Sequence, residues 1–419
     1  MGLGVDDTVS PRVAEKMVYS GTFAASFTEA SSHLAKLSHL FVSAERIRRA
    51  CQHVGSDRIE QQEQLQKAHQ VKRLPERCHG KPADVEAPEI ACVMADGGRY
   101  QVLDRRRGSA SGRSARKGEH WKESRIGLLA SMSGDRHESD PHPELPSALC
   151  YSAVAEKLSD IGKTGAELDF SDDGEPTLGT PSTTDSDKFP GPTLQSRGVV
   201  ASARNWEDFG RLLASQAWYR GFAASTRKVF VSDGSATIEK LHRIHFSEHT
   251  SVLDILHALS YSLAAARAVS SDEAAAQRQY DVWAEKIWKG CVREVIDELK
   301  AHSERMGEPP PDGGTDDPRQ IVRASRIYYE NHAKRMNYPH YRREGFPLTS
   351  SLIESTVKQV SRRVKGSEKY WSTEGGEMML RLRGEYLSDG NPMGAYWTRR
   401  SRQATGMRTY RRNTPALYP

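Results

Sequence analysis

The stretch Ile90-Ala-Cys-Val-Met-Ala-Asp-Gly-Gly98 decides the fold, because a compact apolar run ends there in an acidic residue and two glycines. The run at 90–95 is typical of a buried strand. Asp96, Gly97 and Gly98 predict a turn directly after it. Residues 100–103 are then expected to pair back as the second strand of a hairpin, and residues 126–132 form a candidate third strand.

A second stretch has the same pattern, since residues 228–232 predict a short strand that Asp233 and Gly234 follow. Each stretch places a carboxylate at the C-terminal end of a strand, where side chains converge in an open α/β sheet. The third candidate, Glu354, lies in the first turn of a helix predicted over residues 351–364, with Thr349 or Ser350 as its N-cap. Three acids from separate elements suit Mg²⁺, a hard cation that prefers oxygen ligands.

Each of these acids also has a plain structural explanation. Asp-Gly after a strand is common turn chemistry, and an acidic residue in the first turn of a helix complements the helix dipole. Spacing and composition alone therefore do not single out Asp96, Asp233 and Glu354.

The remaining elements are predicted from apolar spacing and from composition. Residues 133–196 are rich in Ser, Thr, Asp, Gly and Pro and predict a flexible surface insertion. The other expectations are helices at 206–220, over most of 252–300 and at 321–336, a strand at His245 and Phe246, and a loop at 309–318.

The first 85 residues are predicted to be helical. One apolar face ends near Leu37, residues 38–42 form a break, and Ser43 can cap a second helix. That helix is expected to carry Arg46, Arg48 and Arg49 toward solvent, which fits a DNA-binding helix-turn-helix. A plain helical hairpin has the same pattern. A polar linker is predicted from Gln61 to the first strand.

Composition excludes several classes of protein. The five cysteines are scattered and form no CxxC pair, which argues against a disulfide framework or a zinc site. No apolar run is long enough to cross a membrane and no signal segment is evident, so a cytoplasmic protein is expected. The net charge is only +5, but residues 105–117 and 396–412 are strongly basic, which indicates a polyanionic partner or an ordinary solvated tail.

One long stretch resembles a known family. Gly345-Phe-Pro-Leu-Thr-Ser-Ser-Leu-Ile-Glu354-Ser-Thr-Val-Lys358 is similar to the last catalytic motif of DDE transposases from bacterial insertion sequences, particularly the Kra-type group. The family pattern Gly-Leu-Pro-Ile-Gly-Ser-Gly-x-x-Glu-Ser-x-x-Lys continues into a basic segment and a Trp, here residues 362–366 and Trp371. The similarity extends to both Asp-Gly stretches, to the motif 121–123, to the segment containing Asp254 and His257, and to four residues before the last motif: Asn331, Arg335, Met336 and Tyr338. The chain departs from the pattern at Thr349 and Ser351, where the family has glycines, and in the insertion at 133–196.

The resemblance implies an α/β, RNase H-like fold: a mixed sheet flanked by helices, with an all-α insertion between the second Asp and the Glu. It implies that Asp96, Asp233 and Glu354 bind Mg²⁺ or Mn²⁺, as a pair of ions about 3.5–4 Å apart that stabilises the attacking and leaving oxygens of an in-line phosphoryl displacement. The implied partners are double-stranded DNA, both transposon ends and target, and further copies of the chain, because two ends must be brought together.

Other residues are candidates for supporting roles. Lys358 and Arg362 follow Glu354 by one and two helical turns, and with Arg363 and Lys365 they are predicted to contact phosphates, although a Glu-Lys helix pair would look the same. Trp371 can stack on bases or pack in the core. Asp254 and His257 are assigned either an outer-sphere role near the metal ions or, for His257, simple helix packing.

The predicted organisation has seven parts. They are a helical DNA-binding domain at 1–85, a first catalytic part at 86–132, the insertion at 133–200, a second catalytic part at 201–251, a helical insertion at 252–345, the catalytic helix and C-terminal part at 346–385, and a basic tail at 386–419. Two alternative functions remain open, an RNase H-like nuclease or resolvase that only hydrolyses, and a catalytically dead DNA-binding remnant.

Overall fold

A mixed sheet forms the centre of the computed structural model, which describes residues 9–103, 120–154, 191–310, 314, 316–366 and 369–404. The strand order is β3-β2-β1-β4-β5, and β6 pairs with the end of β1. β1, β2 and β3 are antiparallel, whereas β4, β5 and β6 each run parallel to their neighbour. The strands are β1 (Ile90–Val102), β2 (Trp121–Ser133), β3 (Thr193–Ser202), β4 (Arg227–Ser232), β5 (Thr250–Leu253) and β6 (Tyr370–Trp371).

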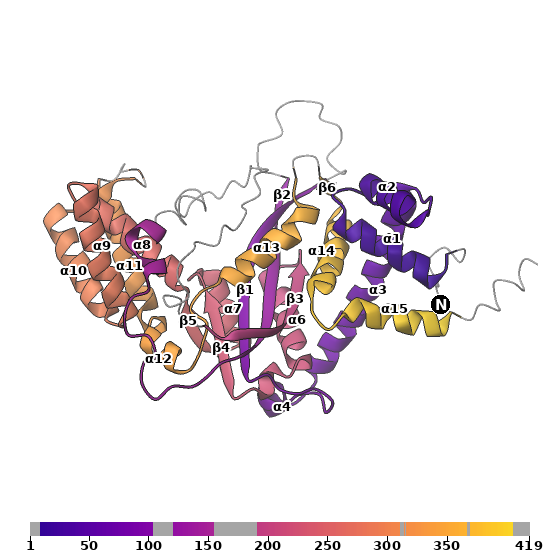
Figure 1. Ribbon diagram of the computed structural model, residues 1–419, viewed down its shortest axis with the longest axis horizontal. Helices are drawn as coiled ribbons and strands as arrows, with labels where there is room; N and C mark the ends of the chain where they lie inside the picture. The colour runs from indigo at the N-terminus through magenta and orange to yellow at the C-terminus, as the bar shows by residue number, and fades with distance from the viewer. Residues whose placement is uncertain are drawn as a thin grey trace, which may run out of the picture.

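Helices cover both faces of this sheet, so the predicted mixed α/β sheet flanked by helices is confirmed (Figure 1). Ala91, Val93 and Ala95 of β1 pack in one core with α6 (Trp206–Tyr219) and α7 (Ala236–His245). The alternate residues Ile90, Cys92 and Met94 belong to a larger core on the other face, which includes α13 (Ser351–Val364) and α14 (Thr373–Leu387). Burial on both faces explains the unbroken apolar run.

The predicted turn at Asp96-Gly97-Gly98 is wrong. β1 continues through these residues to Val102 and pairs with β2 along its whole length, with Gly97 opposite Arg125 and Gly98 opposite Ser124. A Cβ at Gly98 would lie 2.8 Å from the Ser124 Oγ, so this glycine is needed for close strand pairing rather than for a turn. Residues 100–103 therefore do not form the second strand of a hairpin, and residues 126–132 form most of that partner, β2.

The other strand predictions had mixed outcomes. β4 confirms the strand at 228–232, whereas His245 and Phe246 lie at the end of α7, and the next strand is β5. The insertion predicted at 133–200 contains β3 and a segment that packs on the helices. Within that segment the Leu149 carbonyl accepts a hydrogen bond of 2.8 Å from Tyr280, and the His142 carbonyl accepts one of 2.9 Å from Trp288. Residues 155–190 of the insertion lie outside the described residues.

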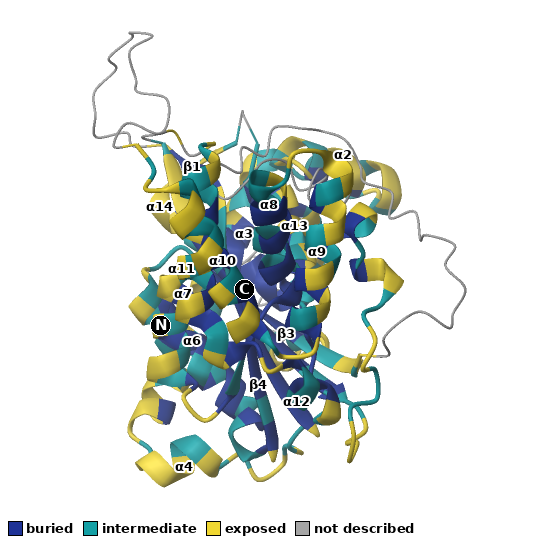
Figure 2. Cartoon of the chain, turned by 90° about the vertical axis from the view of Figure 1, so that its left-hand side faces the viewer, coloured by how far each residue is buried: buried dark blue, intermediate teal, exposed yellow. Residues whose placement is uncertain are grey.

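A group of helices lies at one edge of the sheet, between β5 and α13 in the sequence (left in Figure 1). They are α8 (Ile255–Val269), α9 (Glu273–Trp288), α10 (Val292–Met306), α11 (Pro318–His332) and α12 (Tyr338–Arg343). Their inner faces are buried, with Trp283, Trp288 and Tyr329 among the largest enclosed side chains (Figure 2). The helices predicted over most of 252–300 and at 321–336 are present, and the latter ends as a short 3-10 turn, Ala333–Arg335. The predicted loop ends where α11 begins, at Pro318.

Four helices precede the sheet: α1 (Pro11–Phe23), α2 (Phe27–Ser38), α3 (Ala44–Gln70) and α4 (Leu74–His79). Ser43 caps α3 as predicted, accepting a 3.3 Å hydrogen bond from the Arg46 amide. The linker predicted from Gln61 is wrong, because α3 continues to Gln70. The polar residue Gln62 faces inward there and accepts a 2.8 Å hydrogen bond from Arg381 of α14.

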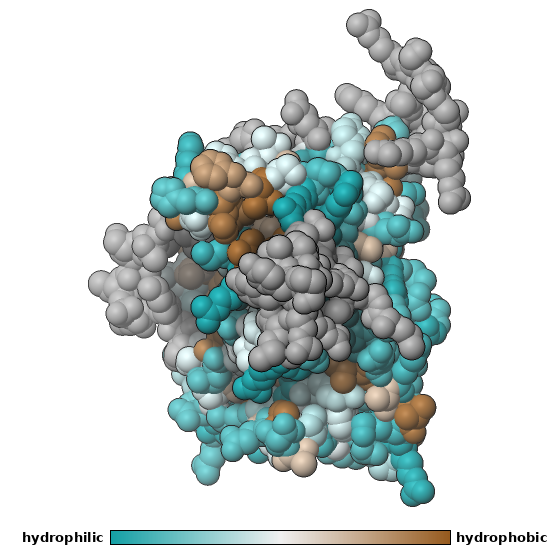
Figure 3. Space-filling model, turned by 90° about the vertical axis from the view of Figure 1, so that its right-hand side faces the viewer, coloured by the Kyte–Doolittle hydropathy of each residue, from teal (hydrophilic) through white to brown (hydrophobic). Residues whose placement is uncertain are grey.

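The α2–α3 turn presents apolar as well as basic side chains. Leu37 is 82% exposed and Phe41 is 88% exposed, while Tyr19 and Phe23 of α1 are partly exposed. Figure 3, which faces this end of the molecule, shows apolar side chains gathered in its upper part. The chain ends, among the described residues, with α15 (Pro392–Gln403). In the part of the chain that the structure describes, no helix is both long and apolar enough to cross a membrane.

Candidate metal centre

Asp96 lies in β1, and Asp233 directly follows the end of the adjacent parallel strand β4. The β1–β4 ladder pairs Cys92 with Val229 and Met94 with Val231. Asp96 and Asp233 each follow the last of these pairs by two residues, and neighbouring strands lie about 4.8 Å apart. Because side chains alternate between faces along a strand, the Asp96 carboxylate lies on the face of Met94. This is also the face of α13, since a Cβ at Gly98 would lie 3.6 Å from Ser361 of that helix.

Asp96 is half-buried and is paired with Ile126 of β2. Its Oδ1 accepts a 2.6 Å hydrogen bond from the Gly97 amide. Burial is the main reason why the pKa of Asp96 is raised from 3.8 to about 6, and the negative charges of Asp233 and Glu354 add to the rise. Asp233 and Glu354 are therefore close enough to Asp96 to act on it electrostatically, and a shared metal site for the three carboxylates stays a prediction.

Asp233 lies where β4 ends. Its Oδ1 accepts a 2.9 Å hydrogen bond from the Ser235 amide, which leads the chain into α7, and its carbonyl accepts a 3.0 Å bond from Tyr328 of α11. Gly234 has a φ of +95°, so the predicted turn is present at this second Asp-Gly pair. Among the described residues, Oδ2 of Asp233 and Oδ2 of Asp96 have no hydrogen-bond donor, which leaves both atoms open to a cation.

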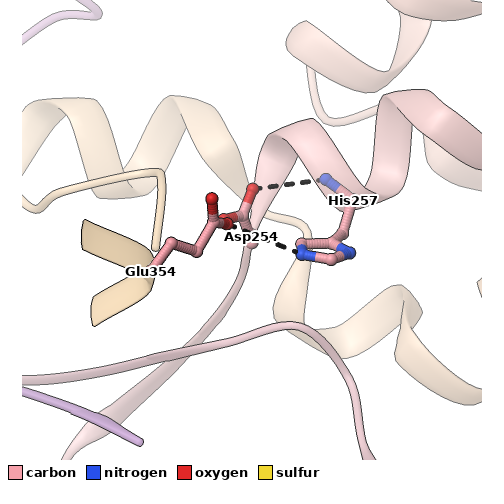
Figure 4. A group of neighbouring side chains, drawn as sticks. All are labelled: Asp254, His257 and Glu354. Atoms are coloured by element: carbon pink, nitrogen blue, oxygen red, sulfur yellow. Dashed lines mark hydrogen bonds and ion pairs between the residues drawn. The ribbon is translucent and has the colours of Figure 1, made fainter. Parts of the chain in front are cut away.

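Glu354 lies in the first turn of α13, which packs across β1 and β2. Its Oε1 is 3.9 Å from Nε2 of His257 and 3.3 Å from Oγ of Ser350 (Figure 4). The Glu354 side chain is 36% exposed and that of His257 is 44% exposed, so both can reach a ligand from solvent. His257 is therefore not the packed core residue that was one of its two predicted roles.

Glu354 also belongs to a compact group of possible ligand atoms, and in the described part of the chain neither Asp96 nor Asp233 is a member of that group. Donor atoms of Asp254, His257 and Glu354 all lie within 4.8 Å of one another, so this group could hold a metal ion. Asp254, however, is fully buried, and its carboxylate accepts hydrogen bonds from the Leu256 and His257 amides and from the amide and hydroxyl of Ser350. A carboxylate offers about four lone-pair sites. Asp254 is thus already satisfied, whereas Asp96, Asp233 and Glu354 keep free oxygen atoms.

The basic residues that follow Glu354 divide into two kinds. Lys358 and Arg362 are exposed on α13. Arg363 is buried, donates a 2.8 Å hydrogen bond to the Gly21 carbonyl, and lies 4.6 Å from the Phe27 ring and 4.8 Å from the Trp371 ring. The prediction that Arg363 contacts phosphate is corrected, because its guanidinium joins α13 to the end of α1.

Trp371 and Lys365 lie beside that contact. The Trp371 indole donates a 3.0 Å hydrogen bond to the Val364 carbonyl and covers Arg363, so core packing, the second of its predicted roles, is the one observed. Lys365 is half-buried, with its Nζ 6.0 Å from the Trp121 ring.

The positive charge of the predicted basic face of α3 is partly neutralised by an acidic residue, Glu45, of the same helix. Arg49 is exposed and lies 2.8 Å from Glu45, which also binds Arg48 at 2.6 Å. Arg46 is half-buried rather than turned fully to solvent. Arg49 is therefore the most accessible of the three predicted arginines.

Some contacts of the site were not foreseen. Ser350, one of the two predicted N-caps, does occupy that position in α13, but its hydroxyl contacts Asp254 and Glu354 instead of capping the helix. Tyr328 donates a hydrogen bond to the Asp233 carbonyl and has no sequence signal beyond its place on a predicted helix. In the resembling motif at 121–123, Glu123 faces away from the acids and accepts a 3.2 Å hydrogen bond from Trp206 of α6. Comparison with known protein families found no match to this chain, and no curated protein matches it.

Proposed function

We propose that this chain is a DNA transposase that cleaves and joins DNA strands at insertion-sequence ends with the help of divalent metal ions. The observation that carries the proposal is the placement of Asp96 in β1 and of Asp233 directly after the adjacent parallel strand β4, in a sheet that the helix bearing Glu354, α13, packs against. The mixed sheet supports an RNase H-like catalytic domain, because its first and fourth strands are adjacent and bring the two aspartates to one edge. Helices α8 to α12 would form the all-α insertion between the second Asp and the Glu.

The residues present fit Mg²⁺ or Mn²⁺. Asp96, Asp233 and Glu354 would hold one or two such ions through carboxylate oxygens. Burial, with a smaller part from the charges of Asp233 and Glu354, raises the pKa of Asp96, and a cation would favour its ionised form. A bound ion supplies positive charge that stabilises the attacking and leaving oxygens. The protein itself holds the acids in register and leaves His257 beside Glu354, within reach of a phosphate or water.

The surface around Glu354 supports a nucleic-acid partner. Lys358 and Arg362 are exposed on the same helix, one and two turns beyond the acid, where they can neutralise phosphates next to the scissile bond. The α2–α3 pair, with Arg49 exposed, would read the transposon end as a helix-turn-helix. Two ends must be joined in one reaction, so the active form is proposed to contain at least two copies of the chain.

The proposal is tested by a plasmid assay with candidate insertion-sequence ends. Wild type with Mg²⁺ or Mn²⁺ should nick the ends and join their 3′-hydroxyls to target DNA, and Asp96→Ala should lose on the order of 10²–10³-fold of both activities. Asp272→Ala is the matched control, because Asp272 only caps α9 at the surface. Nicking without joining would favour a nuclease or resolvase, and no activity from folded protein would favour the DNA-binding remnant.

The DNA path is tested by reversing one charge. Arg362→Glu should weaken DNA binding and lower the slope of log K against log salt concentration by about 1 for every phosphate that the arginine neutralises in wild type. Arg305→Glu on α10 is the matched control, since Arg305 is also exposed but lies in the helical group away from the sheet. An unchanged salt slope for Arg362→Glu would remove α13 from the proposed DNA path.

A further inference from the structure

We propose that Asp254 is a positioning residue that fixes the helix bearing Glu354 against the strand bearing Asp233. The expected effect of Asp254 on metal binding rests on the proposed function. Its position between the two elements follows from the hydrogen bonds described below. Asp254 follows β5 and is the N-cap of α8, and it is completely buried. It therefore touches neither solvent nor DNA directly, and its carboxylate acts only through its neighbours.

The backbone at Asp254 is tied to both elements that carry acids. The Asp254 amide donates a 2.8 Å hydrogen bond to the Ser232 carbonyl, directly before Asp233. The next amide, of Ile255, donates a 3.0 Å bond to the Leu348 carbonyl, in the segment that leads into α13. The residues around 254 thus form the junction at which β4, α8 and the start of α13 meet.

The side chain completes this junction by bridging two helix N-termini. Oδ1 accepts from the Leu256 amide at 2.6 Å and the His257 amide at 3.3 Å in α8, while Oδ2 accepts from the Ser350 amide at 2.6 Å and from the Ser350 hydroxyl in α13. Both helices direct their unpaired amides and positive dipole ends at one carboxylate, which explains how a buried anion is stabilised without a salt bridge among the described residues.

Only a carboxylate fits this position. Each of its oxygens must accept hydrogen bonds, one from α8 and one from α13, so an amide side chain would turn its NH₂ group toward donors on one of the two helices. Glu354 lies four residues after Ser350, one turn into the same helix, and Ser350 Oγ is 3.3 Å from its Oε1. Without the hydrogen bonds to Oδ2, the first turn of α13 should shift, and with it the distance from Glu354 to Asp233.

Asp254→Asn in the full chain tests the proposal. Hydrogen exchange of residues 350–355 should become faster, and Mn²⁺ affinity of the DNA-free protein, measured by calorimetry, should fall by about 10–100-fold. Asp272→Asn is the matched control, because Asp272 is also an N-cap but accepts hydrogen bonds from one helix only, α9. This variant should match wild type in both measurements. Ser350→Ala removes only the hydroxyl contact and should produce the same two changes on a smaller scale, which keeps the test decisive if Asp254→Asn does not fold.

Three results would overturn the proposal. Unchanged exchange and unchanged Mn²⁺ affinity in both Asp254→Asn and Ser350→Ala would show that the bridge holds nothing in place. Reduced Mn²⁺ affinity with unchanged exchange would make Asp254 a direct metal ligand together with His257 and Glu354. Faster exchange with unchanged affinity would make Asp254 a structural cap only. If wild type itself binds no Mn²⁺, the proposed function fails. The hydrogen-exchange measurement then still shows whether Asp254 stabilises the first turn of α13.

Discussion

The two Asp-Gly segments of this chain look alike in sequence but have different backbones. At Asp96 the strand continues, because β2 is long enough to pair with β1 beyond Gly98. At Asp233 the partner strand β5 ends at Leu253, and Gly234 turns the chain into α7 with a φ of +95°. The shared feature is the parallel pairing of β1 with β4, whose last pair, Met94 and Val231, lies two residues before each Asp. The comparison shows that the length of the neighbouring strand, rather than the Asp-Gly sequence, determines whether a turn forms.

The different backbones give the two acids different surroundings. Asp96 lies within β1 and is paired with Ile126 of β2, and burial raises its pKa. Asp233 is half-buried at the end of β4, where a backbone amide and open space face its carboxylate. Of the two aspartates, the enclosed one is therefore expected to bear the larger desolvation cost in the metal-free protein.

The largest expected effect on stability is a gain from Asp96→Asn in the metal-free protein. The shift in the pKa of Asp96 from 3.8 to about 6 corresponds to about 3 kcal/mol. Since the folded pKa is raised, the folded state binds the extra proton, and wild-type stability is lost as the pH rises from about 4 through about 6. Asp96→Asn should thus exceed wild type by up to about 3 kcal/mol at pH 8 and by little at pH 4, in denaturant unfolding with EDTA.

The matched variant for this comparison is Asp233→Asn. Its amide oxygen can keep the Ser235 hydrogen bond, and little buried charge is removed, so its gain at pH 8 should be clearly smaller. Equal gains for the two variants would mean that the environments of the two acids do not differ. A difference between Asp96→Asn and wild type that does not change with pH would rule out titration of Asp96 as the cause.

The next effect concerns the glycines that follow the two acids. Gly234→Ala should cost about 1–3 kcal/mol, because a side chain is strained at its positive φ. The added Cβ would also lie 3.0 Å from Nε2 of His332. Gly97→Ala should change stability by no more than about 0.5 kcal/mol, because Gly97 lies in the extended strand β1 and its Cβ would meet only the flexible end of Glu123 at 3.1 Å. Thermal unfolding of both variants measures the difference, and a costly Gly97→Ala would mean that both segments need a glycine.

Apolar runs and caps made much of the fold predictable. The strands at 90–95 and 228–232, the cap at Ser43 and the helix at 351–364 were each predicted from local pattern and are present. Elements whose burial depends on polar side chains were not predictable in this way. Helix α3 extends past Gln61 because Gln62 and His69 are buried against other helices, and β3 begins within a polar stretch.

The candidate site was predictable only in part, for a similar reason. Local signals made Asp96, Asp233 and Glu354 candidates, but only the resemblance singled them out, as it did Asp254 and His257. The bridge from Asp254 to Ser350 joins residues 96 positions apart, and no local pattern encodes such a contact. Arg363 was misassigned because an arginine in a basic run has the same sequence whether it faces solvent or, as here, the carbonyl groups at the end of α1.

The smallest expected effect concerns the hydrogen bonds made by the backbone at the two aspartates. The Asp96 backbone belongs to the β1–β2 ladder, whereas the Asp233 carbonyl depends on a side chain, the Tyr328 hydroxyl at 3.0 Å. Tyr328→Phe should therefore cost about 1 kcal/mol in denaturant unfolding, the typical value of one such hydrogen bond.

Tyr261→Phe is the control for this last prediction. The rings of Tyr261 and Tyr328 stack 3.8 Å apart, and the Tyr261 hydroxyl has no hydrogen-bond partner among the described residues, so both variants keep the stack and only Tyr328→Phe removes a hydrogen bond. Tyr261→Phe should stay within about 0.5 kcal/mol of wild type. If the two variants behave alike, the Asp233 segment does not depend on α11, and the turn at Gly234 alone sets the position of its carboxylate.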